Sequence, residues 1–337
     1  MLTDRLDPFH TKYPIWNAGM GGGLAGPELV HGISKAGGFG ILGIGGLPTN
    51  RISDMISETR NMTRKPFGAN VILPMSDGKD VDVCFDNQVD VLILFWGDPQ
   101  PFVRDAHKRG VFLVSQCGTA EEAAAAASSG VDAVIIQGIE AGGHVKAEQN
   151  LSTALEETCK ELTHLPIIAA GGISSGRQIA NHLKAGAKAV SLGTRFVVSH
   201  EAYASKLYKE RIVSSTAADT TLTTLFDIGW KNAKHRVIKT RVYEEWLSQG
   251  SPETGNRQGE NELIGTLTVD SKEVGIPKYT VFPPVPSFRG EIEELPLYAG
   301  ESVSGISKIE PVSSIMRQLV KDLKDATAKI NHKGINL

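Results

Sequence analysis

The sequence is poor in cysteine, in long apolar runs and in net charge, and each scarcity excludes a class of protein. Cys84, Cys117 and Cys159 are the only 3 cysteines in 337 residues and form no CxxC pair, which argues against a disulfide framework and a zinc site. No apolar run reaches the roughly 20 residues of a membrane helix. The formal net charge of −3 indicates neither a nucleic-acid nor a membrane partner. Residues 1–7 carry no basic or apolar leader, so we expect a cytoplasmic protein.

What the sequence does contain is an alternation of short β-prone runs and helical stretches between residues 14 and 209. The eight strand predictions are Pro14–Ala18, Phe39–Ile44, Phe67–Leu73, Val89–Phe95, Val111–Gln116, Ala133–Gln137, Pro166–Ala170 and Ala189–Leu192. Helices are predicted between them, near Pro27–Ala36, Asn50–Met62, Asp80–Asn87, Pro101–Arg109, Ala120–Ser129, Ser152–Thr163 and Ser175–Ala185. Eight parallel units can close into a barrel, whereas an open doubly wound sheet has about six strands. We therefore predict an α/β fold, a (β/α)8 TIM barrel.

The alternation stops after Glu210. Ser248–Glu262 is polar and loop-like, and Pro277–Pro286 contains four prolines, so neither can form long regular structure. We expect residues 211–310, here called the cap region, to be a smaller helical and loop region that covers the barrel mouth. Helical periodicity returns over Pro311–Ile330. The predicted division is a barrel at 1–210, the cap region at 211–310, and a final helix at 311–337 that packs on the barrel.

Two glycine loops follow the last two predicted strands. Gly171 and Gly172 come after the seventh strand, and Gly193 and Thr194 come after the eighth. Loops at these places bind phosphate in many barrels, because backbone N–H groups without a neighbouring Cβ can approach the phosphate oxygens. A role in tight turns alone is the alternative, and the placement of both loops favours phosphate binding.

Two GxGxxG strings, Gly21–Gly26 and Gly38–Gly43, could suggest a dinucleotide-binding fold. The second lies within a predicted strand. The first lacks an acidic residue between Glu28 and Asp54, where the group that binds the ribose should occur. The sequence therefore argues against a Rossmann site.

A histidine follows the sixth predicted strand, in Gly138-Ile139-Glu140-Ala141-Gly142-Gly143-His144. The strand order puts His144 on the catalytic face of a barrel, where an imidazole can move a proton. No HxxxH pair or carboxylate-rich cluster accompanies it, so we expect no metal site. The alternative is a histidine that only hydrogen-bonds a loop.

Four segments resemble the nitronate monooxygenases, formerly called 2-nitropropane dioxygenases, and the related flavin-dependent enoyl-ACP reductase II. They are NAGMGGG (17–23), GIEAGGH (138–144), IIAAGGI (167–173) and AGAKAVSLGTRFVVSHEA (185–202). The resemblance is good between about Tyr13 and Thr224 and thin beyond. It implies a TIM barrel that binds FMN noncovalently.

The resemblance also assigns roles to individual residues. Gly19, Met20 and Gly21 would run along the flavin, Asn70 and Gln116 would contact its ring or ribityl chain, and Gln137 and Gly142 would line the same face. Gly171, Gly172, Gly193 and Thr194 would hold the phosphate, and His144 matches the catalytic histidine. Two departures bear on substrate choice: relatives often have a glycine soon after this histidine, where this chain reads Val145-Lys146, and often have lysine in place of Gln116.

The resemblance predicts an FMN-dependent oxidation of alkyl nitronates or nitroalkanes to a carbonyl compound and nitrite, with O₂ as oxidant. His144 would remove a proton from a neutral nitroalkane or hydrogen-bond the nitro oxygens of the anion. The alternative activity is an NAD(P)H-dependent FMN reductase acting on enoyl-ACP or quinones. A basic run from Lys231 to Arg241 could meet an acidic carrier protein, although such a run is more often a solvated helix face.

A third class is a barrel without flavin, such as a phosphate-ester isomerase. The expected partners are a small-molecule substrate and O₂, with no nucleic acid and no membrane. A homodimer is one candidate for the oligomeric state.

Overall fold

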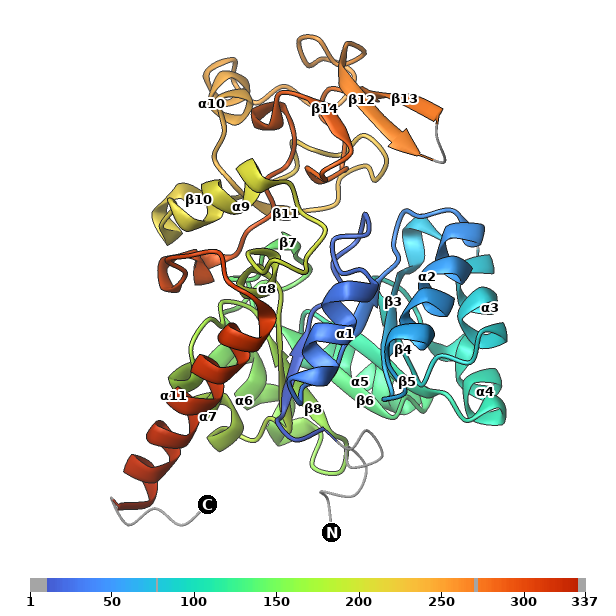
Figure 1. Ribbon diagram of the computed structural model, residues 1–337, viewed down its shortest axis with the longest axis vertical. Coiled ribbons are helices and arrows are strands. Elements are labelled where there is room, and N and C mark those ends of the chain that lie inside the picture. Colours follow the sequence, from blue (N-terminus) through green and yellow to red (C-terminus); the bar gives the residue numbers. More distant parts are fainter. Residues whose placement is uncertain (1–10, 77, 270–271, 333–337) are drawn as a thin grey trace.

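The computed structural model describes residues 11–76, 78–269 and 272–332. It shows a barrel of parallel strands wrapped by helices, with the cap region above one end of the barrel (Figure 1). The predicted (β/α)8 TIM barrel is confirmed. The N-terminal segment used to argue against a leader, and the last five residues of the predicted 311–337 unit, lie outside the described residues.

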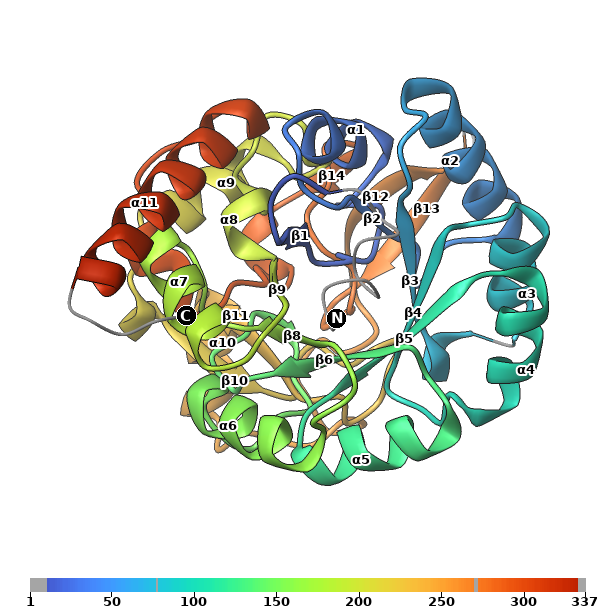
Figure 2. The ribbon, with the colours of Figure 1, turned by 90° about the horizontal axis from the view of Figure 1, so that it is seen from below.

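Eight strands form the barrel, and they match the eight predicted runs. They are β1 (Ile15–Asn17), β2 (Ile41–Gly43), β3 (Gly68–Ile72), β4 (Val91–Phe95), β5 (Phe112–Cys117), β6 (Ala133–Gln137), β8 (Ile167–Ala170) and β9 (Ala189–Leu192). Their order around the sheet is β1-β9-β8-β6-β5-β4-β3-β2, and all their pairings are parallel. Seen along its axis, the barrel forms a ring of strands inside a ring of helices (Figure 2).

The helices of the barrel also follow the prediction. They are α1 (Pro27–Lys35), α2 (Thr49–Met62), α3 (Lys79–Asp86), α4 (Gln100–Arg109), α5 (Ala120–Ser129), α6 (Leu151–Glu161) and α7 (Gly176–Lys184). Local signals set their ends: Ser175 and Gln178 form a capping box at the start of α7. Gly110 and Gly130 end α4 and α5 in the left-handed conformation, which turns the chain back toward the sheet.

The barrel closes between β1 and β2, where few backbone bonds are available. One parallel bridge joins Trp16 to Phe39. The buried side chain of Asn17 supplies two more links, because its Nδ2 donates to the Ile41 carbonyl at 2.8 Å and its Oδ1 accepts from the Ile41 N–H at 2.9 Å. An amide can do both at once, so Asn17 replaces a missing pair of ladder bonds.

The inside of the barrel is packed with side chains. Trp16, Phe39, Ile41, Val91 and Ile168 are among the buried residues of one internal cluster. The rings of Trp16 and Phe39 lie 4.8 Å apart between their centroids. A filled interior leaves room for a ligand only at the mouth, where the carboxyl ends of the strands meet.

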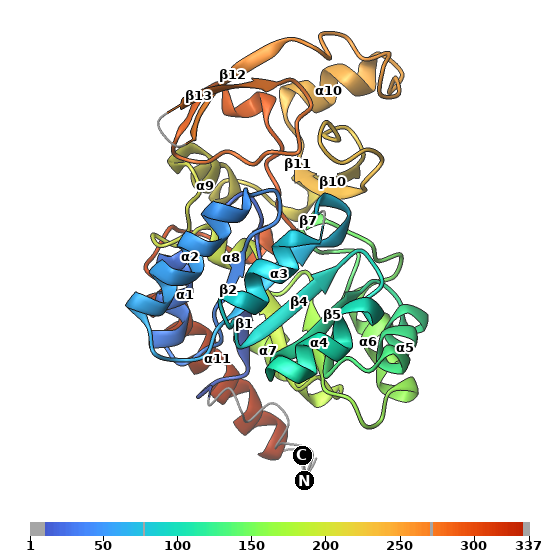
Figure 3. The same ribbon diagram turned by 90° about the vertical axis from the view of Figure 1, so that its right-hand side faces the viewer.

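The cap region contains strands that the sequence analysis did not predict. In one small antiparallel sheet, β11 (His235–Ile238) lies between β10 (Thr220–Thr223) and β7 (Gly143–His144), a two-residue strand just after β6. A second sheet joins β13 (Lys272–Pro277), β12 (Leu263–Val269) and β14 (Phe288–Gly290). Figure 3 shows β7 and β11 between the barrel and the outer part of the cap region.

Four further α-helices occur in the described part of the chain. Short α8 (Thr194–Val197) follows β9, α9 (Lys206–Val213) leads into the cap region, and α10 (Arg241–Ser248) lies at its outer end. Helix α11 (Val312–His332) returns to pack against α7 and α1 of the barrel. No helix in the described ranges is long and apolar enough to cross a bilayer.

The seam between β1 and β2 gives a test of the fold. Replacing Asn17 by alanine leaves the buried N–H and carbonyl of Ile41 without these partners, so we expect Asn17→Ala to lower the free energy of unfolding by about 2–4 kcal/mol. Urea unfolding followed by circular dichroism measures the loss. Asn61→Ala, at an exposed position of α2, is the control and should change little. Equal stabilities of the two variants would contradict the seam role of Asn17.

Candidate active site

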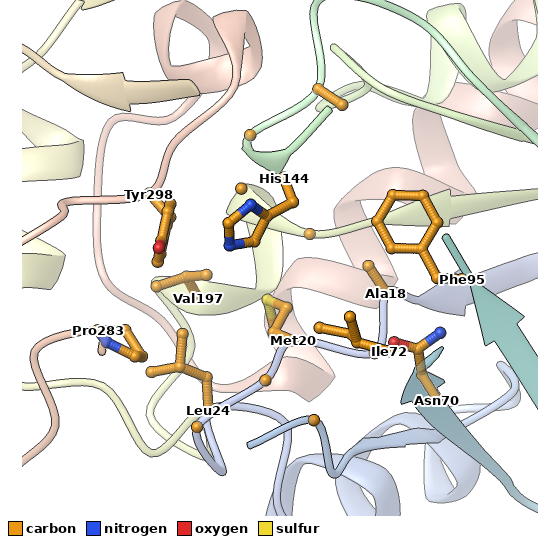
Figure 4. A pocket seen from close by; sticks show the side chains of 18 of the residues that line it. Ala18, Met20, Leu24, Asn70, Ile72, Phe95, His144, Val197, Pro283 and Tyr298 are labelled. Carbon is orange, nitrogen blue, oxygen red and sulfur yellow. The ribbon is translucent and has the colours of Figure 1, made fainter. Parts of the chain in front are cut away.

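A cavity of about 350 Å³ opens at the carboxyl ends of the barrel strands, beneath the cap region. All twelve residues predicted to bind the cofactor or act in catalysis line it: Gly19, Met20, Gly21, Asn70, Gln116, Gln137, Gly142, His144, Gly171, Gly172, Gly193 and Thr194. Figure 4 shows His144 above Met20, between Tyr298 and Phe95. Residues far apart in the sequence thus share one cavity, whose volume lies in the range of ligand sites. The individual roles stay predictions.

The two predicted phosphate loops lie on the same cavity and leave backbone donors free. Among the hydrogen bonds of the described residues, none is donated by the backbone N–H of Gly171, Gly172, Gly193 or Thr194. Gly171 and Gly172 have φ values of 117° and 68°, which a residue with a side chain rarely adopts. The lining contains no Lys, Arg, Asp or Glu in the described part of the chain, so an anion here would depend on backbone N–H groups.

Gly193 differs from the other glycines of the site. Its φ is −94°, which any residue can adopt, and a Cβ would meet only Ala18 Cβ at 3.6 Å and Met20 Sδ at 4.0 Å. The protein itself therefore does not require a glycine here. By contrast, a Cβ on Gly142 would lie 2.3 Å from the Gly300 nitrogen, and one on Gly19 would lie 2.1 Å from Asn70 Cβ. Those two glycines permit close packing around the cavity.

The amide side chains of the site are held by the backbone. Gln137 Nε2 donates to the His144 carbonyl at 3.1 Å, and Gln137 Oε1 accepts from the Lys146 N–H at 3.1 Å. Asn70 Nδ2 donates to the Ile93 carbonyl at 3.4 Å. Gln137 therefore fixes the backbone of the histidine from the end of β6, as well as lining the cavity.

His144 lies among aromatic rings from four other segments. The ring of Trp230 is 4.2 Å away, that of His235 5.4 Å, that of Tyr298 5.6 Å and that of Trp96 6.4 Å, measured between centroids. Nδ1 of His144 is buried and has no hydrogen-bond partner in the described structure. Nδ1 is closed off from the cavity, so Nε2, which is not buried in this way, is the nitrogen that can meet a polar ligand group.

The surroundings keep this histidine neutral. Burial, with a smaller effect from His235, lowers the pKa of His144 to about 3. Burial also lowers the pKa of His235 to about 4. A neutral imidazole with so low a pKa is a poor proton acceptor at neutral pH but can still donate or accept a hydrogen bond.

Arg236 supports the histidine loop, and its position corrects the interpretation of the basic run. The basic run at residues 231–241 was interpreted as more often a solvated helix face. That interpretation is wrong for Arg236, which lies buried on strand β11. Its Nε and Nη2 donate to the Ile139 carbonyl at 3.2 and 3.0 Å, and Nη2 lies 3.3 Å from Glu301 Oε1. Arg236 therefore ties the loop before His144 to the cap region.

The aromatic residues around His144 were not predicted from the sequence. Trp230, His235 and Tyr298 belong to the cap region, which was expected to cover the mouth but was given no site residues. His235 pairs directly with His144 across β11 and β7, yet two residues of β7 give no periodic signal. The positive φ of 64° at Trp96, just after β4, likewise could not be predicted from the sequence.

The lowered histidine pKa values predict a pH dependence of stability. Below the ordinary histidine pKa of about 6.5, the unfolded chain binds protons that folded His144 and His235 do not, so the free energy of unfolding falls as the pH drops from 6.5 toward 4. His144→Asn removes one of these groups and should make the fall smaller. Urea unfolding at several pH values measures it, with exposed His164→Asn as the control. An unchanged slope in His144→Asn would refute the burial argument.

Comparison with known proteins gives the family of this chain. A family model described as nitronate monooxygenase matches residues 3–82 and 75–322. A (3aS,4S,5R,7aS)-5-hydroxy-7a-methyl-1-oxo-octahydro-1H-indene-4-carboxyl-CoA dehydrogenase from Rhodococcus jostii is 33% identical over 71% of this chain and 66% of that protein, just under two thirds of its length. A probable nitronate monooxygenase from Staphylococcus aureus is 28% identical over 78% of this chain and 85% of that protein.

Two solved structures resemble the whole chain. Nitroalkane oxidase from Streptomyces ansochromogenes has a TM-score of 0.80 at 25% identity, covering 97% of this chain and 99% of that one. FabK from Thermotoga maritima has a TM-score of 0.78 at 27% identity, covering 98% of both chains. These matches show that the chain belongs to the nitronate monooxygenase family and is an oxidoreductase.

Proposed function

We propose that this chain binds FMN and oxidises alkyl nitronates to a carbonyl compound and nitrite with O₂. The observation that carries the proposal is the neutral His144, which lines the same cavity as the two glycine loops. A nitronate is a small anion whose nitro oxygens accept hydrogen bonds and whose alkyl part is apolar. The cavity offers it the His144 imidazole together with aromatic side chains in the lining.

The free donors of the cavity fit FMN. The N–H groups of Gly171, Gly172, Gly193 and Thr194 would hold the phosphate, and the space beside Gly193 leaves room for its oxygens. Met20, Asn70 and Gln116 line the cavity beyond this point and would contact the ring or the ribityl chain. When bound, the flavin would supply the electron-accepting chemistry that side chains lack.

The protein would bind and orient the nitronate and keep water away from it. In the reaction, the bond from carbon to nitrogen breaks, nitrite leaves, and the carbon gains an oxygen atom from O₂, so that two nitronates and one O₂ give two carbonyl compounds and two nitrites. A pKa of about 3 makes His144 a weak base, which favours hydrogen bonding to the nitro oxygens over proton removal from a neutral nitroalkane. The preferred substrate is then the preformed anion.

A second candidate function is an NAD(P)H-dependent FMN reductase. The likeness to FabK over 98% of both chains favours it, and the R. jostii relative is named for a CoA thioester substrate. Of the basic residues that could meet an acidic carrier, Lys231 and Lys234 are exposed, whereas Arg236 is buried and engaged with Ile139.

Anaerobic visible spectra separate these functions. We expect purified protein to carry a yellow flavin that bleaches on mixing with propane-2-nitronate and not with NADH, and that forms nitrite when O₂ is admitted. Rapid bleaching by NADH alone would favour the reductase. A folded, colourless protein that takes up no FMN would reject both and favour a barrel without flavin.

His144→Asn tests the histidine in the same assay. Loss of a hydrogen bond to the anion should reduce kcat/KM for the nitronate about 10–100-fold, while FMN affinity stays close to that of the parent. Undiminished turnover of both nitronate and nitroalkane would remove His144 from the reaction.

Gly193→Ala tests the phosphate loop. The added methyl group has room in the protein, so the stability of the FMN-free protein should stay unchanged, but the methyl group would occupy space next to the phosphate. We expect FMN affinity to fall about tenfold, equivalent to about 1.4 kcal/mol. Fluorescence titration with FMN measures it. Gly26→Ala, at an extended position outside the cavity lining, is the matched control, and equal affinities would argue against a phosphate beside Gly193.

A further inference from the structure

The polar stretch Ser248–Glu262 has no role in the proposed reaction, yet it contains one of the most buried charges of the chain. The side chains of Arg257 and Asp227 are only 2% and 1% exposed, and Arg257 Nη1 lies 2.9 Å from Asp227 Oδ1. Arg257 Nη2 also pairs with Glu260 at 2.9 Å, and its guanidinium lies 4.5 Å from the centroid of the Tyr279 ring. A loop that looks solvated in the sequence is therefore fixed from inside by an ion pair.

Asp227 begins the segment that lies over His144. Its Oδ2 accepts from the Thr254 hydroxyl at 2.7 Å and from the Asn232 N–H at 3.3 Å, and its backbone carbonyl accepts from the Trp230 N–H at 3.0 Å. The bonds hold residues 227–232 as a turn. Ile228 and Gly229 of this turn line the cavity.

A second set of bonds holds the same turn from its other side. The Ile228 N–H donates to the Tyr279 carbonyl, and the Val281 N–H donates to the Ile228 carbonyl, both at 3.0 Å. Tyr279 is also the residue whose ring lies against Arg257. The guanidinium of Arg257 thus contacts both segments that form this part of the cavity wall.

Trp230 is the point where this anchored turn meets the histidine. Its ring is 4.2 Å from that of His144 at an angle of 40°, and 4.9 Å from that of Trp96 at an angle of 73°. We propose that Trp230 is a positioning residue that sets the orientation and water exposure of His144, and that the Asp227–Arg257 ion pair keeps Trp230 in place. The part concerning catalysis rests on the proposed function, whereas the part concerning the histidine environment does not.

The chemistry of the contact explains the role. A ring packed against the imidazole at this tilt restricts its rotation and excludes water from that face, so the neutral form is favoured. The titratable groups that face His144 are His235 on β11 and Tyr298 ahead of the short helix η5 (Glu301–Gly305). Trp96 and Trp230 carry no titratable group, so removal of Trp230 changes solvation without changing charge.

Histidine NMR of the FMN-free protein gives a readout that does not depend on turnover. In ¹⁵N-histidine-labelled protein, with His144→Asn used to assign the signal, Trp230→Ala should raise the pKa of His144 by about one unit or more toward its ordinary value. Trp230→Phe, which keeps a ring, should restore most of the parent behaviour. Tyr203→Ala removes an exposed aromatic ring outside the cavity lining and is the control. An unchanged His144 titration in Trp230→Ala would overturn the proposal.

Kinetics of the FMN-loaded variants test the catalytic part. Trp230→Ala should lower kcat/KM for the nitronate about tenfold or more, with FMN affinity unchanged and rescue by Trp230→Phe. If the parent protein turns over no nitronate, the proposed function fails and the NMR titration still decides the role of Trp230. Parent-like kinetics in Trp230→Ala, with an active parent, would overturn the catalytic part.

The ion pair is tested by removing both charges together. Arg257→Leu alone leaves the Asp227 and Glu260 carboxylates without their cation and should destabilise the protein, whereas Asp227→Leu with Arg257→Leu removes the more buried carboxylate too and should recover part of the stability. If the pair positions Trp230, the double variant still shows the raised pKa of His144 and the reduced kcat/KM. A double variant with the parent titration and kinetics would mean that the pair serves stability alone, and would overturn this part.

Discussion

The site depends on the closure of a parallel sheet. Because all eight strands run in one direction, their carboxyl ends can meet only if the sheet returns on itself, and the return occurs at the seam where the Asn17 side chain pairs with the backbone of Ile41. Closure brings the loop after β1 next to the loop after β2, where the Gly22 N–H donates to the Gly45 carbonyl at 3.2 Å. A sheet left open at this seam would leave these two loops at opposite edges.

The barrel and the cap region contribute different parts of the cavity. The glycine loops and the amides of Asn70, Gln116 and Gln137 come from the barrel. The cap region contributes Tyr298 to the lining, and its Trp230 and His235 pack against His144. His144 lies where the two meet, on a strand that leaves the barrel to pair with β11. Its low pKa is therefore a property that the cap region imposes on a residue of the barrel.

The barrel and the placement of its site could be predicted from the sequence, because their signals are local. Each strand is a short apolar run ended by a turn, and each phosphate loop lies next to the strand that positions it. The strands of the cap region escaped prediction because their partners are distant: β7 has two residues and its partner β11 lies about ninety residues later. Arg236 was assigned to a solvated helix face because charge alone does not reveal that Ile139, far away in the chain, supplies its hydrogen-bond acceptor.

The proteins that this chain resembles carry the names of different enzymes. One is a nitroalkane oxidase, one is a CoA-thioester dehydrogenase, and a third is FabK. A shared barrel does not determine the reaction, because the chemistry is set by the groups placed around the ligand. In this chain, the main polar group is an imidazole that burial keeps neutral. The described residues that line the cavity include no Lys, Arg, Asp or Glu. A cavity of this kind offers no charged side chain to anchor a second phosphate, but it can hold a small anion by hydrogen bonds. The turn that carries Trp230 lies against this imidazole. We therefore expect substitutions in that turn to alter the substrate preference of the enzyme.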